Sequence, residues 1–462
     1  MFKKLLGLSL VVLFGFATGI CLAKYSGGDG SEANPYRISN AQYMNDIGLH
    51  QEDWGSHFVM VNDINLAQFT GTQFNIIGFL DANFIEPNHQ PFTGIFDGNG
   101  HVIFDFTYHT DEDFGVGLFG FVEGPNAVIK NLRMERCDVN SMDSYNVGCL
   151  LGANAEGAVL NCSVKGTVSG EQSIGLLTGV NVGIISNCHV TGIVDGNNSA
   201  GGLVGTNAGT ILDCYTAGIV RGNNDGTGGL VGLNAFGDGI VSNCYSTTNI
   251  YGDKDIGGLV GMHNTFTFLG RSIISNCYAS GHVYGNDYVG GLIGSGDSGS
   301  YEACFWDLDI NPGLNGIGNL TDPNVIGETT ENMQKENTFT SAGWDFVGET
   351  ANGSNDIWWI HKGKDYPRLW WETIGPMVLL DFLAQDIIDL ELQPGLENSL
   401  LAKLDTALQK LEDDNENNDA AVINLLEAFI NAVEAQRGKK IPEADADALI
   451  EAAQEIINLL SG

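Results

Sequence analysis

The sequence predicts a mainly β protein, a parallel β-helix or solenoid, followed by a small all-α helical bundle. The first observation is a glycine-rich phrase, Gly-Gly-Leu-Val-Gly-x-Asn, at residues 201–207 and again at 228–234. The last glycine of each full or looser copy falls at 152, 179, 205, 232, 261 and 294, so the period is 26 to 33 residues. Self-similarity at this period indicates a solenoid. The second observation is that glycine becomes rare after residue 376, where helix-forming residues take over.

Each repeat unit holds three short extended segments separated by turns. In one unit the segments are 187–194, 201–205 and 210–212, and polar turns are expected at 195–198 and 207–209. The segments are too short for helices and rich in β-branched residues. Such a unit cannot bury a core alone, but coiling the chain places each unit on the last with a rise of ~4.8 Å.

Several residue types recur in step with the phrase, and stacked units would align them. The Asn that ends the phrase (154, 181, 207, 234) and the polar residue before each cysteine are expected to form structural ladders. The glycines are expected to permit positive φ at corners and close passage of neighbouring backbones. The recurring cysteines predict a ladder of buried free thiols, since free Cys is a small hydrophobe; at least one disulfide is the alternative. These cysteines are Cys137, Cys162, Cys188, Cys214, Cys244, Cys277 and Cys304.

The phrase, together with Asn-Cys-Tyr at 243–245 and 276–278, resembles the GLUG-motif repeat of bacterial surface and exported proteins. The resemblance covers about residues 115–305. It implies a pectin-lyase-like or haemagglutinin-like, right-handed β-helix, in a family that includes adhesins and the non-catalytic parts of secreted proteases. It implies no activity for the repeat itself.

The carboxyl-terminal segment shows three helical stripes of apolar residues. The first is expected to be capped by Asn398-Ser399, the second to end at Gly438, and the third to follow Pro442. Residues 429–441 resemble the FIMAH-type domain found at the ends of exported proteins. We expect an attachment or protein-contact module.

The amino terminus reads as a secretory signal. Lys3-Lys4 precedes the apolar stretch 5–16, and small residues favour cleavage near Ala23; a lipoprotein acylated at Cys21 is the alternative. No later apolar run is long enough to span a bilayer, so a secreted or cell-surface location is expected. The predicted organisation is 1–23 signal peptide, 24–125 amino-terminal cap and first turns, 126–305 repeats, 306–375 Trp-rich cap and 376–462 helical domain.

The charge of the chain limits its partners. With 20 basic and 57 acidic residues the net charge is −37, so nucleic acid and anionic membrane surfaces are excluded as partners, whereas glycans and surface proteins are not. Aspartates gather in one turn of the repeat, which turn chemistry explains; weak Ca²⁺ binding is the functional alternative, and no other cofactor is expected. These aspartates are Asp195, Asp225, Asp253, Asp255 and Asp287.

Aromatic residues supply the candidate ligand contacts. Six of the seven Trp lie within 306–375, where they either cap the open end of the solenoid or stack on sugar rings. Trp358 and Trp370 are candidates because each belongs to a Trp-Trp pair that would send one ring outward from a strand. Phe266 and Phe268 lie in an insertion that either forms a binding edge or folds back on the solenoid.

No catalytic motif or paired carboxylates in register are found, so no catalytic residue is assigned. The sequence therefore predicts an exported, non-enzymatic β-solenoid that acts in surface adhesion or in carbohydrate or protein binding. The alternatives are a polysaccharide-active lyase or glycosidase on a β-helix scaffold, and a structural spacer.

Overall fold

The computed structural model describes residues 24–462 except for several short segments. Backbone contacts divide the chain into two compact units. The first extends through Met333 and takes in Ala342–Trp344, and the second comprises Gln334–Ser341 and the chain from Asp345 onward. The predicted signal peptide lies outside the described residues. The segments left out are 81–88, 112–113, 236–238, 265–271, 298–299, 348–350, 354, 361–362, 364, 373–375, 391, 412–418 and 461–462.

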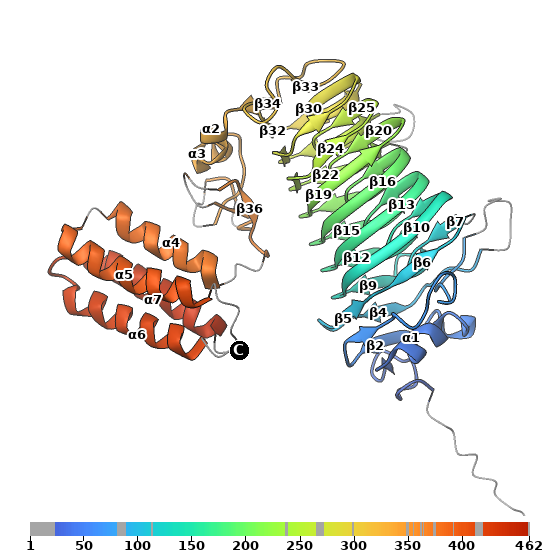
Figure 1. Cartoon of the computed structure of the whole chain (residues 1–462), viewed down its shortest axis with the longest axis horizontal. Coiled ribbons are helices and arrows are strands. Elements are labelled where there is room, and N and C mark those ends of the chain that lie inside the picture. Colours follow the sequence, from blue (N-terminus) through green and yellow to red (C-terminus); the bar gives the residue numbers. More distant parts are fainter. Residues whose placement is uncertain are drawn as a thin grey trace, which may run out of the picture. The chain divides into compact units, whose positions relative to one another are not determined.

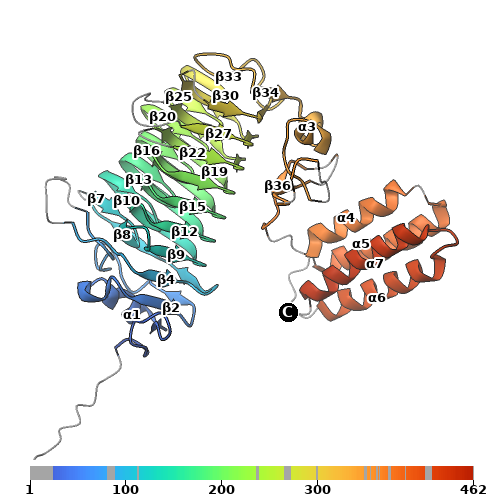
Figure 2. The same ribbon diagram turned by 180° about the vertical axis from the view of Figure 1, so that it is seen from behind.

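The first unit is a parallel β-solenoid, as the sequence predicted. Figures 1 and 2 show its strands stacked turn upon turn, with β9, β12 and β15 in succession along one side. That side is a ten-stranded parallel sheet with one strand from each turn. Its strands are β1 (Tyr36–Ile38), β2 (His57–Met60), β4 (Ile95–Asp97), β9 (Val128–Lys130), β12 (Ala158–Leu160), β15 (Ile184–Ser186), β18 (Thr210–Leu212), β22 (Ile240–Ser242), β27 (Ile273–Ser275) and β31 (Ser300–Glu302).

The other strands of the solenoid form one bent, 24-stranded sheet, in which the recorded pairings are parallel. They are β3 (Ile64–Asn65), β5 (Val102–Phe104), β6 (Thr107–His109), β7 (Phe114–Val116), β8 (Phe119–Glu123), β10 (Arg133–Val147), β11 (Leu151–Ala155), β13 (Ser163–Gly175), β14 (Thr178–Asn181), β16 (His189–Gly201), β17 (Val204–Asn207), β19 (Tyr215–Gly222), β20 (Asp225–Gly228), β21 (Val231–Asn234), β23 (Tyr245–Ser246), β24 (Asn249–Tyr251), β25 (Lys254–Gly257), β26 (Val260–His263), β28 (Tyr278–Ala279), β29 (Val283–Tyr284), β30 (Asp287–Gly296), β32 (Cys304–Asp307), β33 (Asn315–Ile317) and β34 (Val325–Glu328).

The polar turn expected at 195–198 is wrong. These residues lie inside the long strand β16, where Asp195 pairs with Ser169 and Gly196 with Gly170 of the preceding turn. The chain bends instead at single residues in the left-handed region, such as Ser199 with φ of 49°. One residue with positive φ redirects a strand without ending its ladder of hydrogen bonds, which explains why the pattern of polar residues looked like a turn.

A second set of bends lies at the polar residue before each ladder cysteine. Asn161, Asn187 and Asn243 all have φ between 52° and 53°. Asn tolerates this conformation better than most residues, which accounts for its recurrence there. The predicted ladder at this position is confirmed, since Nδ2 of Asn161 donates to Oδ1 of Asn131 over 3.2 Å, and Asn243 donates to Asp213 over 3.0 Å.

The ladder of phrase-ending Asn residues is also confirmed, and it is fully buried. Nδ2 of Asn154 donates to Oδ1 of Asn181, which donates to Asn207, which donates to Asn234, over 2.8, 2.9 and 2.8 Å. The same Nδ2 groups also donate to backbone carbonyls three to five residues or two residues further along their own turns. The sequence did not reveal the last member: Asn234 donates to Nδ1 of His263 over 3.1 Å.

The phrase glycines are required for space rather than for positive φ, which corrects one of their two expected roles. Neither Gly202 nor Gly205 has positive φ. A Cβ on Gly205 would lie 2.2 Å from the backbone carbon of Ser173, and one on Gly202 would lie 2.1 Å from the carbonyl oxygen of Gly229. The predicted close passage of neighbouring backbones is therefore confirmed.

The cysteine ladder has six members, and Cys137 is not one of them. The equivalent position in its turn is Leu132, whose carbonyl accepts from Ser163 as that of Cys162 accepts from His189. Cys137 lies after a bulge in β10 and forms a disulfide with Cys149. The alternative of one bridge is thus correct beside a ladder of buried free thiols, Cys162, Cys188, Cys214, Cys244, Cys277 and Cys304.

This arrangement predicts the number of reactive thiols. The chain without residues 1–23 has eight cysteines, of which two are bridged, so six thiols should react with a chromogenic disulfide reagent after denaturation without reductant. Burial raises the pKa of the ladder thiols well above its ordinary value, so the native protein should react far more slowly. Eight reactive thiols would contradict the disulfide, and two or fewer would contradict the ladder.

Both ends of the solenoid are covered. At the amino-terminal end, helix α1 (Ala41–Ile47) begins at the predicted cap Asn40 and buries Met44 and Ile47 in the solenoid core. At the other end, the Trp344 ring packs on Phe305 with ring centroids 5.7 Å apart, and its Nε1 donates to the carbonyl of Ala303 over 2.9 Å. Trp344 therefore acts as the expected aromatic cap.

The remaining elements begin with short helices α2 (Thr330–Met333) and α3 (Glu336–Thr340) and the antiparallel pair β35 (Trp358–Trp359) and β36 (Arg368–Leu369). A bundle of four described helices follows: α4 (Pro376–Asp389), α5 (Pro394–Leu411), α6 (Asp419–Gln436) and α7 (Glu443–Leu460). A helical domain was predicted, but α4 was missed. The cap at Asn398-Ser399 is wrong because α5 begins at Pro394, a residue favoured in the first turn. No helix of the described chain is both long and apolar enough to cross a membrane.

Candidate functional site

The predicted aspartates do not line up in one column. Asp195 lies in register with Arg221, and its Oδ1 is 3.0 Å from Nη1 of that arginine. Oδ1 of Asp253 instead accepts a hydrogen bond from Nδ2 of Asn286 over 2.7 Å.

The other three aspartates surround one lysine. Asp225 and Asp287 lie in register with Lys254 from the turns on either side. The lysine Nζ is 3.6 Å from Oδ1 of Asp225 and 3.6 Å from the buried Oδ2 of Asp255. Because each acid has a cationic or amide partner, the described residues hold no group of three side chains suited to a metal ion.

The aromatic candidates are separated by the structure. Trp358 is fully buried and Trp359 nearly so, which contradicts the expectation that this pair sends one ring outward. Trp370 is exposed over 49% of its surface and remains available for contact. Phe266 and Phe268 lie outside the described residues.

An apolar pocket with a volume of about 530 Å³ lies over the first turns of the solenoid. Its floor is a column of outward-facing side chains on successive turns, Phe121 on β8, Ala153 on β11 and Val180 on β14, which lie in register. Phe121 and Ala153 form a small hydrophobic cluster with Leu80, separate from the interior core. A volume of this size suits part of a small or extended ligand.

Aromatic and amide side chains form the wall of this pocket. Phe114 on β7, Tyr145 on β10 and Gln172 on β13 lie in register on three consecutive turns. The rings of Phe114 and Tyr145 stack with centroids 6.0 Å apart. Tyr145 keeps 42% of its surface exposed, so the wall offers aromatic surface and hydrogen-bonding groups to solvent.

Left-handed residues create the angle between wall and floor. Asn146 and Ser173, which directly follow Tyr145 and Gln172, have φ of 58° and 59°. The bend turns the wall strand toward the floor of the next strand, and Ser173 Oγ reaches Thr206 Oγ1 at 2.9 Å. Thr206 continues the floor column beyond Val180.

The wall changes in chemistry along the solenoid. Gln172 pairs with Asn198 in the next turn. One turn further the equivalent position is Asp225, two residues before Thr227, which pairs with Ala200; Lys254 and Asp287 then follow. The column thus runs from aromatic through amide to charged side chains.

The pocket offers binding groups but no catalytic pair. Glu123 is the only carboxylate among its described lining residues, whereas glycoside hydrolysis uses two carboxyl groups in most enzymes. His89, Asn146 and Gln172 add hydrogen-bonding groups near the aromatic wall. Sequence reasoning missed Phe114 and Tyr145 because they lie before the regular copies of the phrase. The alternation of Tyr145 with buried Ser144 and Val147 was the available signal.

The fold and this pocket define a β-solenoid of the kind that fits a surface or structural protein. The chain is similar to halomucin of Haloquadratum walsbyi, with 29% identity over 158 residues, and to a Gly-rich membrane protein of Evansella cellulosilytica, with 30% identity over 146 residues. These alignments cover 33% and 30% of the chain, but only 2% and 16% of the two relatives. No family model matches the chain. No solved structure matches it.

Proposed function

We propose that this protein is an exported, non-enzymatic surface β-solenoid that binds an extended glycan through the apolar pocket. The observation that carries the proposal is the wall of Phe114, Tyr145 and Gln172 on three consecutive turns. Successive residues of this column are separated by one turn, ~4.8 Å, so an extended chain lying along the solenoid axis can contact each of them. Solenoids commonly use such stacked surfaces for binding.

Charge narrows the glycan class to neutral or cationic chains. Glu123 lies at the pocket, and the net charge of the protein is −37. Acidic polysaccharides would be repelled over distances of about a Debye length, ~8 Å at physiological ionic strength. A sugar instead presents apolar C–H faces to the aromatic wall and hydroxyl groups to Gln172 and Asn146.

Several finer assignments belong to the same proposal. Export by cleavage near Ala23 accounts for residues 1–23. The GLUG and FIMAH resemblances support a surface role, in which the helical bundle attaches the solenoid to a protein or surface partner. The two distant relatives, one named as a mucin-like protein and one as a membrane protein, are compatible with that location.

A glycan array with the chain lacking residues 1–23 tests the proposal. We expect binding to neutral or amino-containing glycans, and a loss of at least about tenfold in affinity, 1.4 kcal/mol, for Tyr145→Ala. Tyr284→Ala is the matched control, because Tyr284 is similarly exposed but does not line the pocket. Equal losses in both variants, or no glycan bound, would contradict the proposal.

A reducing-sugar assay on the bound glycans separates binding from catalysis. We expect no turnover, since the pocket lacks a second carboxylate among its described residues. Release of reducing ends that Glu123→Gln abolishes would support the polysaccharide-active alternative instead.

A further inference from the structure

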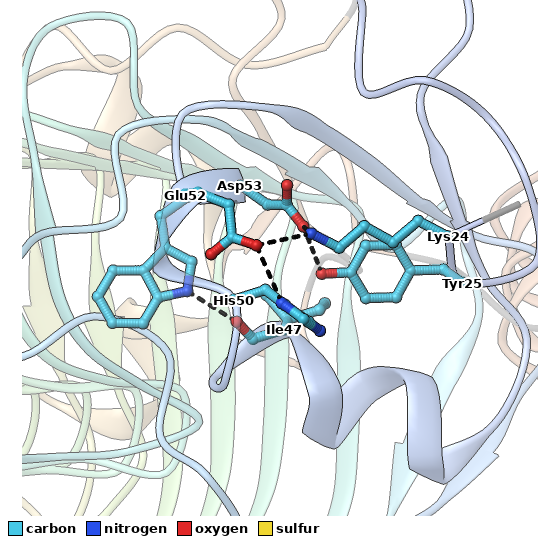
Figure 3. A network of polar contacts seen from close by, with 7 residues as sticks. Lys24, Tyr25, Ile47, His50, Glu52 and Asp53 are labelled. Atoms are coloured by element: carbon cyan, nitrogen blue, oxygen red, sulfur yellow. Dashed lines mark hydrogen bonds and ion pairs between the residues drawn. The ribbon is translucent and has the colours of Figure 1, made fainter. Parts of the chain in front are cut away.

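The first two described residues, Lys24 and Tyr25, are fixed in a polar network (Figure 3). Nζ of Lys24 lies 2.5 Å from Oδ2 of Asp53 and 3.0 Å from Oε1 of Glu52. The hydroxyl of Tyr25 donates to the same Asp53 oxygen over 2.8 Å. The Asp53 side chain is buried, so these two partners satisfy a carboxylate that water reaches poorly.

The acceptors are held on a rigid support. Glu52 and Asp53 belong to the 3₁₀ helix η1 (Gln51–Asp53), which follows α1 closely. Nε1 of Trp54 donates to the carbonyl of Ile47 over 2.8 Å and so ties the end of η1 to the end of α1 (Figure 3). Because α1 contributes to the solenoid core, the network forms only when the amino-terminal cap has folded.

Tyr25 is locked by packing as well as by its hydroxyl. Its ring is 6% exposed and makes edge contacts with the rings of Tyr36, Tyr43 and Phe58 at 5.1, 6.3 and 5.8 Å. Its φ of 56° is in the left-handed region, which a bulky residue seldom adopts. The backbone at Tyr25 is therefore not extended in the folded protein.

Electrostatics reinforces the docked state. Burial opposes the charge of Lys24, but the carboxylates of Asp53 and Glu52 outweigh it and raise the Lys24 pKa. Burial and the bond to Asp53 raise the pKa of Tyr25, so the phenol remains a donor. Undocking both residues would leave the buried Asp53 carboxylate without these partners, which is unfavourable.

We propose that this network closes the predicted leader cleavage site, so that the bond between Ala23 and Lys24 is cut only while Lys24 and Tyr25 are undocked. The inference rests on the export assigned under the proposed function. Hydrolysis consumes one water molecule, breaks the amide bond, and leaves a carboxylate on Ala23 and an α-ammonium on Lys24. Cleavage of a docked segment requires local opening, and its rate then follows the population of the open form.

The order of events has a physical advantage. The α-ammonium produced by cleavage adds a second positive charge to the residue that already contacts two carboxylates. Cleavage therefore favours docking, and docking completes the amino-terminal cap of the solenoid. Folding of this cap is thereby placed after leader removal.

Cleavage of the full chain, residues 1–462, by a purified signal peptidase in detergent micelles tests the inference. We expect the folded chain to be cut at least tenfold more slowly than the same chain in urea that the peptidase tolerates. Asp53→Asn and Tyr25→Phe, checked for folding by circular dichroism, should each speed cleavage of the folded chain. Glu32→Gln, at an exposed site outside the network, should not.

The outcomes separate the two proposals. Equal cleavage of folded and unfolded wild-type chains would overturn the closing role of the network and leave export intact. Folded variants that are cut no faster than wild type would also overturn it. If the unfolded chain is not cut after Ala23, the export assignment fails together with this inference, whereas glycan binding by the pocket is measured independently.

Discussion

Asn207→Leu should lower the free energy of unfolding of the solenoid by about 2–5 kcal/mol. Asn207 lies in the middle of the buried amide ladder, where its Oδ1 accepts from Asn181 over 2.9 Å and its Nδ2 donates to Asn234 over 2.8 Å and to the carbonyl of Gly209 over 3.1 Å. Leucine has similar volume but leaves at least two buried groups without partners. Each costs about 1–3 kcal/mol.

Urea unfolding of the chain without residues 1–23, followed by far-ultraviolet circular dichroism, measures this effect. Asn224→Leu is the matched control, since Asn224 is exposed in the same part of the array. Because solenoid stability is a sum over turns and the contacts between them, we expect the loss to appear first in turns adjacent to residue 207. A loss below about 1 kcal/mol, or one equal to that of the control, would show that the ladder is not a major source of stability.

The solenoid was predictable because its determinants repeat. A period of 26 to 33 residues and β-branched segments specify parallel stacking, and stacking then aligns every Asn that ends a phrase. The side-chain hydrogen bonds from Asn154 to Asn234 follow from register alone. What repeats in the sequence could therefore be assigned to the scaffold without coordinates.

Features that interrupt the repeat were harder to predict. Cys137 has a spacing of 25 residues from Cys162, close to the period, yet a bulge moves it out of the ladder and toward Cys149. Spacing cannot reveal this, because Leu132 fills the ladder position and resembles any other core residue. Tyr145 escaped notice for a related reason: only the bend at Asn146 places it opposite Phe121 in one pocket.

The aspartates show how a pattern can suggest the wrong chemistry. Their residue type and position near glycines resembled a stacked turn that could hold Ca²⁺. Insertions between turns shift Asp195, Asp225 and Asp253 into different columns, where Arg221, Lys254 and Asn286 face them. Partners of this kind depend on register to within one residue, which a loose repeat does not specify.

His263 makes the stability of the solenoid depend on pH. It occupies the end of the amide ladder, fully buried, where its Nδ1 accepts from Asn234 and must therefore be unprotonated. Its Nε2 has no hydrogen-bond partner among the described residues. Burial lowers the pKa of His263 to about 4, and the nearby Asp297 opposes this only in part.

The sign of the effect follows from the two pKa values. The unfolded chain binds a proton at His263 near pH 6.5, whereas the folded protein binds it only near pH 4. The stabilisation due to neutral His263 is therefore complete above pH 6.5 and is lost as the pH falls toward 4. A difference of this size is worth about 3 kcal/mol.

His263→Asn isolates this contribution. Asparagine continues the ladder with Oδ1 as acceptor and does not titrate, so the variant should lose less stability than wild type between pH 7 and pH 4, by about 3 kcal/mol. Carboxylates and the other histidines titrate equally in both proteins and cancel in the comparison. His282→Asn, at an exposed site, should follow the wild-type profile. Parallel profiles for wild type and His263→Asn would show that His263 is not held neutral by the fold.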